Sequence, residues 1–144
     1  MRPVPGRLLW LGHVGDLRDP RALLNAGVGA VVELADSEPM AMLPRELIRC
    51  RFPLSDGGGN PPWLLRLAAE TVAALLRGGV PTLVCCGAGM SRSVCVAAAA
   101  VALVERRPLD DTVREVATTG PADVAPGLLT ELAACIQTHP TSEG

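Results

Sequence analysis

The longest apolar run of the sequence, from Val94 to Val104, constrains the fold more than any other feature. The run has 11 residues, about half of them Ala, and is too short to span a bilayer as a helix. A helix that is apolar on every side has to be buried in a protein core. The sequence therefore predicts a buried helix from Arg92 to Glu105.

The composition supplies the material for that core. The chain has 144 residues, of which 49% are hydrophobic and only 2% aromatic, so the core must consist of Ala, Leu and Val. No repeat and no Pro-, Gly- or Ser-rich linker divides the chain. We therefore expect a single domain over residues 1–144, with its core at about 8–138.

Residue types that are missing or rare exclude several functions. The chain contains 13 Arg and no Lys, which excludes a Walker A phosphate loop and a pyridoxal Schiff base. Its two His residues, His13 and His139, lie far apart in sequence, which disfavours a His-rich metal site. A net charge of −2 disfavours nucleic acid as a partner. An odd number of Cys, with no signal peptide and no membrane span, favours a cytoplasmic protein.

Short apolar segments alternate with helical patterns along the chain. The expected strands cover residues 8–11, 28–34, 47–54 and 80–85, and the expected helices are a short one opened by Asp19-Pro20, Trp63–Arg77, Arg92–Glu105 and two amphipathic helices after them. Asp110 is expected to cap the first of these two, and glycines at 27 and 78–79 to end earlier helices. This pattern predicts an α/β fold with a central, mostly parallel sheet of about four to five strands and helices on both faces.

The segment from Leu83 to Ser93 carries the chemistry. A buried strand runs up to Cys86, a turn of small or slim residues follows, and a helix begins near Arg92. Such a turn directs backbone N–H groups and the positive end of the helix at one point, which binds an anion. We therefore expect a phosphate-binding loop between a strand and a helix.

Two side chains of this segment suggest which reaction the loop supports. At the base of the loop, the field that attracts phosphate also favours the thiolate form of Cys86. Arg92 supplies a planar guanidinium that matches two phosphate oxygens. A thiolate, an anion-binding loop and an arginine together indicate phosphoryl transfer through a cysteine.

The pattern Cys-x5-Arg-Ser at residues 86–93, with Gly89 inside it, resembles the signature of the cysteine-dependent protein tyrosine phosphatases, above all their compact, atypical dual-specificity group. Segments 9–12 and 31–34 resemble the opening of that group. Asp56, 30 residues before Cys86 in a Gly-rich loop, is placed like the family's general acid. The resemblance covers about residues 8–138.

The resemblance implies a two-step reaction that needs no metal and no organic cofactor. Cys86 would attack phosphorus and form a cysteinyl-phosphate while Asp56 protonates the leaving oxygen, and water would then hydrolyse the intermediate with Asp56 as base. Ser93 would help to release the thiolate, and Arg92 would bind the phosphate and stabilise the transition state. The phosphate loop itself would consist of Gly87, Ala88, Gly89, Met90, Ser91 and Arg92.

One departure from the family concerns the residue before the nucleophile. The family usually has His there, and its hydrogen bonds favour the thiolate, whereas this chain has Cys85. A thiol is a much weaker donor than an imidazole. We therefore expect only partial activation of Cys86.

Several candidates also have a structural explanation. Asp56 can simply make a turn before Gly-Gly-Gly, and Asp36 is a competing general acid that more readily caps a turn. Ser93 can be an ordinary residue of the first helical turn. The remaining candidates are arginines that form either a basic rim or solvated charges at a strand edge, a histidine in a turn, and cysteines in the core: Arg45, Arg49, Arg51, His13, Cys50, Cys95 and Cys135.

The sequence is compatible with three functions that belong to different classes. The first is a phosphomonoester hydrolase of the dual-specificity type, and its neutral loop favours a phosphorylated protein or a small aryl phosphate over a phosphoinositide. The second is a rhodanese-like sulfurtransferase, which also places a Cys in an anion-binding loop. The third is a non-catalytic phosphoprotein-binding module, which only Cys85 favours. No nucleic acid and no membrane is expected as a partner, and the sequence leaves the preferred phosphoresidue and the oligomeric state open.

Overall fold

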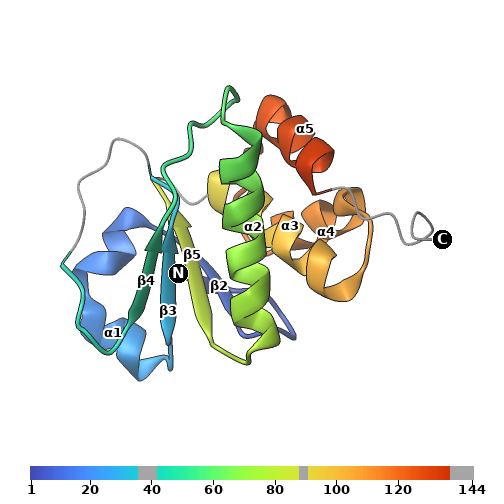
Figure 1. Ribbon diagram of the computed structural model, residues 1–144. Coiled ribbons are helices and arrows are strands. Elements are labelled where there is room, and N and C mark those ends of the chain that lie inside the picture. The colour runs from blue at the N-terminus through green and yellow to red at the C-terminus, as the bar shows by residue number, and fades with distance from the viewer. Residues whose placement is uncertain (36–41, 88–90, 137–144) are drawn as a thin grey trace.

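The computed structural model describes residues 1–35, 42–87 and 91–136 (Figure 1). Its centre is a five-stranded sheet in the order β1-β2-β5-β3-β4. The strands are β1 (Arg2–Pro3), β2 (Leu9–His13), β3 (Ala30–Glu33), β4 (Ile48–Arg51) and β5 (Thr82–Cys86). β1 is antiparallel to β2, and the other neighbouring pairs are parallel. The predicted α/β fold with a mostly parallel sheet is confirmed.

Helices cover both faces of the sheet. The 3-10 helix η1 (Val14–Arg18) and α1 (Pro20–Asn25) cover one face, where Leu17 and Leu23 cluster with Val31 and Leu83. The helices on the other side are α2 (Pro62–Arg77), α3 (Arg92–Glu105), α4 (Leu109–Ala117) and α5 (Pro126–Cys135) (Figure 1). Of these, α2 and α3 contact the sheet directly. Alternate residues of the central strands β2, β3 and β5 thus enter two different cores, which is why these strands are largely apolar.

α3 is the buried helix that the apolar run predicts. Every residue from Arg92 to Ala102 is buried, and the helix contacts the sheet, α2, α4 and α5. Its alanines allow these neighbours to approach its backbone closely. The hydroxyl of Thr112 in α4 reaches across and donates to the carbonyl of Ala98 at 2.9 Å. The small side chains therefore let one helix pack against elements on all sides.

Helix ends mostly follow the sequence. The Asp19 carboxylate accepts from Ala22 N at the start of α1, and Gly79 after α2 has φ +74°, which favours glycine. The expected cap at Asp110 is wrong, because Pro108 occupies the N-cap position of α4 and no side chain caps the helix. Asp110 lies in the first turn instead, where its charge interacts favourably with the helix dipole.

The strands expected at 28–34, 47–54 and 80–85 are all shorter in the structure, and proline explains the last two. Pro81 has no N–H, and the N–H of Val80 closes the end of α2 by donating to Leu75 O, so β5 begins only at Thr82. The segment after β4 leaves the regular ladder near Pro53, although Leu54 N still donates to Leu34 O at 3.1 Å. The chain thus stays beside β3 as it leads into the Asp56 loop.

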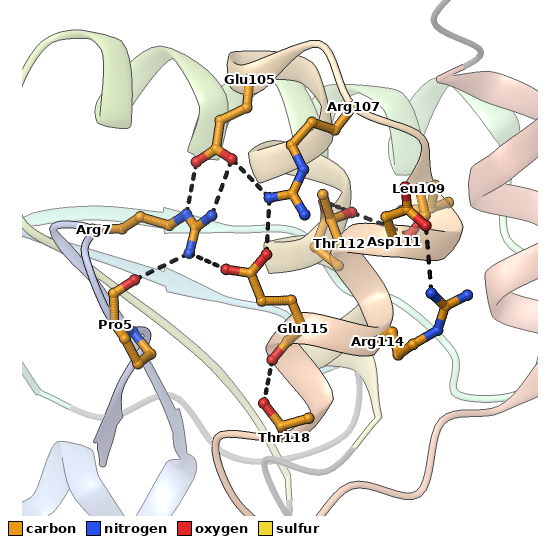
Figure 2. A network of polar contacts seen from close by, with 11 residues as sticks. Pro5, Arg7, Glu105, Arg107, Leu109, Asp111, Thr112, Arg114, Glu115 and Thr118 are labelled. Atoms are coloured by element: carbon orange, nitrogen blue, oxygen red, sulfur yellow. Dashed lines mark hydrogen bonds and ion pairs between the residues drawn. The ribbon is translucent and has the colours of Figure 1, made fainter.

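At the end of the sheet away from the Asp56 loop, a network of charged side chains connects β2 to the helices (Figure 2). Arg7, before β2, pairs with Glu105 at the end of α3 and with Glu115 of α4, each at 2.7 Å. Arg107 pairs with the same two carboxylates at 2.9 and 2.8 Å. Hydrogen bonds from Arg7, and then from Arg107, lower the pKa of both carboxyls. The network ties the start of β2 to α3 and α4.

The arginines of β4 are neither a basic rim nor solvated edge charges. Glu33 of β3 is 1% exposed, and its carboxylate lies 2.6 Å from Arg49 Nε and 3.5 Å from Arg51 Nη1. Both side chains are mostly buried against that carboxylate. They neutralise a charge inside the fold, whereas Arg45 is exposed.

Candidate active site

Cys86 is the last residue of β5, at the carboxyl end of the central parallel strands, where sites of open α/β sheets form. Its side chain belongs to the core between the sheet and α2 and α3 and is 2% exposed. The thiol lies 3.5 Å from Ser93 Oγ in the first turn of α3, and donates to it in the neutral form. Ser93 is therefore placed to hydrogen bond the sulfur in either ionisation state.

Cys85 points the opposite way from Cys86. It is completely buried in the core under η1 and α1, with Leu17, Leu23 and Leu83. Burial raises the pKa of the Cys85 thiol far above its usual range, and the nearby Glu33 carboxylate raises it further. Cys85 is therefore a neutral thiol on the far face of the sheet.

Arg92, the first residue of α3, is only 9% exposed. Its Nη1 donates to Leu54 O at 3.0 Å and to Leu34 O at 3.5 Å. Leu34 follows β3, and Leu54 lies two residues before Asp56. The guanidinium is thus fixed between the end of β3, the base of the Asp56 loop and the start of α3.

Ser91 joins the loop after Cys86 to the loop that carries Asp56. Its hydroxyl donates to Asp56 Oδ1 at 2.7 Å and accepts from Ala125 N at 3.1 Å. Ser91 is the N-cap residue of α3, yet its side chain does not cap the helix because these two contacts use it. A carboxylate 30 residues before Cys86 in the sequence is in this way bound to the same loop.

The Asp56 loop has a defined internal structure. The side chain of Asn60 accepts from Ser55 N at 2.7 Å and donates to Ser55 O at 2.9 Å, so it closes the loop at its base. The three glycines at 57–59 have φ of +101°, +144° and +79°, conformations that other residues rarely adopt. The Gly-rich composition therefore serves a specific turn.

Two of the candidate residues, Asp56 and Cys86, also raise the pKa of the same buried thiol, that of Cys95. Burial raises the pKa of the Cys95 thiol to about 12, and the negative charges of Asp56 and Cys86 raise it as well. Cys95 is a buried core residue, as expected, whereas Cys50 and Cys135 are half-buried, and all five cysteines are free thiols. Asp56 and Cys86 thus act on one common neighbour.

The structure brings together Cys86, Ser91, Arg92, Ser93 and Asp56, and it places Gly87 directly after β5. Ala88, Gly89 and Met90 lie outside the described residues, as does the competing acid Asp36. Glu131 and the side chain of Asn60 also hold the Asp56 loop, and the sequence pattern did not point to them. Nothing in the local sequence marks Glu131, because its partners lie 71–72 residues away.

Two of the three aromatic residues, Phe52 and Trp63, flank the Asp56 loop in the sequence. Trp63, at the start of α2, follows the Asp56 loop and is 67% exposed, whereas Phe52 packs partly against the core. His13 lies opposite Cys86 in the register of β2 and β5, and its Nδ1 accepts from Gly15 N at the start of η1. His13 therefore lies in the turn between β2 and η1, as the sequence predicts.

Within the described residues, no three His, Cys, Asp or Glu side chains gather in an arrangement that could hold a metal ion. The described helices are also either too short or too polar to cross a bilayer.

A parallel sheet whose central strand ends in a Cys-x5-Arg loop, followed by a buried helix, defines the fold of the cysteine-dependent phosphatases, and this chain has that fold. Comparison with solved structures narrows the likeness to the dual-specificity type. Human DUSP28 is 23% identical, with both chains covered over their full length and a TM-score of 0.85. A mouse putative dual specificity phosphatase, complexed with zinc tungstate, is 24% identical, with 98% of this chain and 92% of that chain covered and a TM-score of 0.81.

The same fold also occurs in a protein with a different description. The human tyrosine phosphatase-like serine/threonine/tyrosine-interacting protein is 17% identical, with 93% of each chain covered and a TM-score of 0.77. No family model and no curated protein sequence matches the chain. These comparisons establish the fold, and the function has to be argued from the site.

Proposed function

We propose that the protein is a cysteine-dependent phosphomonoester hydrolase that acts on a phosphorylated protein or a small aryl phosphate. The observation that carries the proposal is the bond from Ser91 to Asp56, because it joins a carboxylate to the loop between Cys86 and Arg92. A module that only bound phosphate would need neither a nucleophile nor an acid. Ser93, 3.5 Å from the sulfur, adds a partner for a leaving thiolate.

The proposed reaction has two steps. In the first, Cys86 Sγ forms a bond to phosphorus, the P–O bond of the ester breaks, and Asp56 transfers its proton to the leaving oxygen. In the second, water attacks phosphorus and gives a proton to Asp56 while the S–P bond breaks. Inorganic phosphate leaves, and Cys86 returns to a thiolate that the Ser93 hydroxyl hydrogen bonds.

Arg92 and the loop amides supply the charge stabilisation in this proposal. The transition state spreads negative charge over the equatorial phosphate oxygens, and a fixed guanidinium binds this arrangement more strongly than the ground state. Because Arg92 is anchored to the carbonyls of Leu34 and Leu54, little reorganisation is needed. The anchoring is what distinguishes Arg92 from a surface arginine.

The test is hydrolysis of p-nitrophenyl phosphate against pH under reducing conditions, for wild type, Cys86→Ser and the matched control Cys135→Ser. We expect turnover by the wild type and the control and none by Cys86→Ser. Mass spectrometry of acid-quenched wild type should find phosphate on Cys86. Turnover by Cys86→Ser would contradict the mechanism.

The same preparations test the two other functions. A sulfurtransferase would form thiocyanate from thiosulfate and cyanide, which we do not expect, because that reaction has no use for Asp56. A binding module is favoured by one observation, the neutral Cys85 thiol where the family has His. Phosphopeptide binding without any turnover would establish that function instead.

A further inference from the structure

We propose that Glu131 of α5 is a positioning residue that holds the Asp56 loop for proton transfer. The inference rests on the proposed function and adds to it a residue that does not touch the phosphate. It follows from the contacts of Ala125, Gly127 and Glu131, at the N-cap and within α5, which together reach the Asp56 loop and Ser91.

The carboxylate of Glu131 binds the Asp56 loop through backbone amides. Oε2 accepts from Gly59 N at 2.7 Å, and Oε1 accepts from Asn60 N at 3.4 Å. Hydrogen bonds from two donors to one charged group are stronger than bonds between neutral partners. In the described part of the chain Glu131 has no arginine partner, so these two backbone amides are the main groups that stabilise its negative charge.

The Asp56 loop needs an external restraint. Its glycines have large backbone freedom, so ordering them costs more conformational entropy than ordering other residues. Asn60 closes only the base of the loop, by bonds to Ser55. Glu131 holds the carboxyl-terminal arm of the loop, at the backbone amides of Gly59 and Asn60.

A second contact of α5 fixes the same loop. Gly127 packs so tightly against the carbonyl of Gly57 that a Cβ at position 127 would overlap it. Ala125, directly before α5, donates its N–H to Ser91, which in turn binds Asp56. The start of α5 thus contacts the loop at Gly57 and, through Ser91, Asp56 itself, and Glu131 adds a charged contact further along the helix.

This arrangement predicts a specific kinetic defect. Removing the Glu131 carboxylate releases the loop but leaves Cys86 and Arg92 in place. Only the proton transfer to the leaving oxygen then suffers. A weakly basic leaving group, such as p-nitrophenolate, departs without much help from an acid, whereas phenolate needs the proton. A general loss of structure would slow both esters alike.

The experiment measures kcat/KM for p-nitrophenyl phosphate and phenyl phosphate with wild type, Glu131→Ala, Glu131→Gln and Asp56→Asn. Glu70→Ala is the matched control, because it removes an exposed helical carboxylate that pairs with Arg66 rather than with the loop. We expect Glu131→Ala to lower phenyl phosphate hydrolysis about 10-fold more than p-nitrophenyl phosphate hydrolysis, at the lower end of the range for general acid catalysis. Glu131→Gln, which retains one acceptor oxygen, should lie between Glu131→Ala and wild type.

Equal effects on both esters, or none, would overturn the inference while the proposed function stands. A wild type that hydrolyses neither ester would overturn the proposed function, and the role of Glu131 in it. Amide hydrogen exchange gives a readout besides activity: the N–H groups of Gly59 and Asn60 should exchange faster in Glu131→Ala. Unchanged exchange would show that Glu131 does not hold the loop.

Discussion

Cys85 and Cys86 are neighbours in the chain but belong to different faces of the sheet and therefore to different environments. Cys86 lies beside Ser93 at the start of α3, whereas Cys85 is enclosed by leucines and approached by Glu33. The alternation of side chains along β5 produces this separation. A change at Cys85 can therefore affect Cys86 only through the backbone and through electrostatics.

Under the proposed mechanism, we predict that Cys85→His raises the rate of phosphate ester hydrolysis at acidic pH. An imidazole donates stronger hydrogen bonds than a thiol, and its cationic form would be stabilised by the buried Glu33 carboxylate. The positive charge favours the thiolate of Cys86, so the acidic limb of kcat/KM should move to lower pH. The larger side chain should also cost about 1–3 kcal/mol of stability, because the site is fully buried.

Cys85→Ala is the control for that substitution, since it removes the thiol without adding a donor. Its acidic limb should remain where the wild-type limb lies. If Cys85→His and Cys85→Ala have the same pH profile, the residue before Cys86 does not affect the ionisation of the proposed nucleophile.

We predict that Ser91→Ala impairs catalysis and stability together. The substitution removes the donor to Asp56 and leaves Ala125 N without its acceptor, which costs about 1–3 kcal/mol for a partly buried amide. kcat/KM for phenyl phosphate should fall at least about 10-fold. Urea denaturation measures the loss of stability, and steady-state kinetics measure the loss of kcat/KM. A Ser91→Ala variant with wild-type kinetics would show that Asp56 needs no anchor.

At the scale of elements, the two ends of the sheet carry different kinds of polar contact with the helices. The carboxyl end carries the candidate site, and the other end carries the network of Arg7, Arg107, Glu105 and Glu115 (Figure 2). Because these arginines lower the pKa of both carboxyls in the folded state, the network stabilises the fold at neutral pH. Its contribution begins to fall as the pH approaches the ordinary value of 4.5 and is lost below the lowered values.

We predict that Arg7→Gln lowers the urea midpoint at pH 7 and that its difference from the wild type shrinks progressively as the pH falls below 4.5. Protonation of the two carboxyls removes the charges that the arginine stabilises, so the difference should narrow as the pH falls below their ordinary pKa of 4.5. Arg114→Gln, which removes an exposed arginine that pairs with Asp111 at 3.5 Å, is the control. A constant difference between Arg7→Gln and wild type at all pH values would mean that Arg7 acts by packing alone.

The sequence predicts elements whose pattern is local and fails where partners are distant. α3 is evident because it is apolar all round, and the loop between β5 and α3 because its residues are contiguous. β1 has only two residues and no pattern of its own. The pairing of Glu33 with Arg49 and Arg51 depends on the register of β3 and β4, which composition does not reveal.

The candidate site shows the same division. Cys86, Arg92 and Ser93 lie within one short segment and carry a recognisable motif, and Asp56 has a Gly-rich neighbourhood. Glu131 has neither, and its role depends on how α5 packs against a loop about 70 residues earlier. Packing between elements distant in sequence is therefore the part of the site that only the structure supplies.

At the scale of the whole molecule, the candidate site lies where several parts of the fold meet. Arg92 is bonded to the chain after β3 and to the base of the Asp56 loop, and Ser91 is bonded to that loop and to the chain before α5. An anion bound between them would link all of these segments. Binding should therefore be visible as stability of the entire domain, because a ligand that binds only the folded state shifts the unfolding equilibrium.

We predict that tungstate, an oxyanion similar in shape to phosphate, raises the unfolding temperature of the wild type. At 100 times its Kd, a ligand stabilises by about 2.7 kcal/mol, which is about 5–10 °C for a chain of this size. Cys86→Ser and Asp56→Asn should keep most of this shift, since neither supplies the positive field, while Arg92→Ala should lose it relative to its own baseline. A shift that persists in Arg92→Ala would place the anion elsewhere. Retention of the shift in Asp56→Asn with loss of turnover would separate phosphate binding, which the loop and Arg92 provide, from proton transfer, which depends on how the fold holds Asp56.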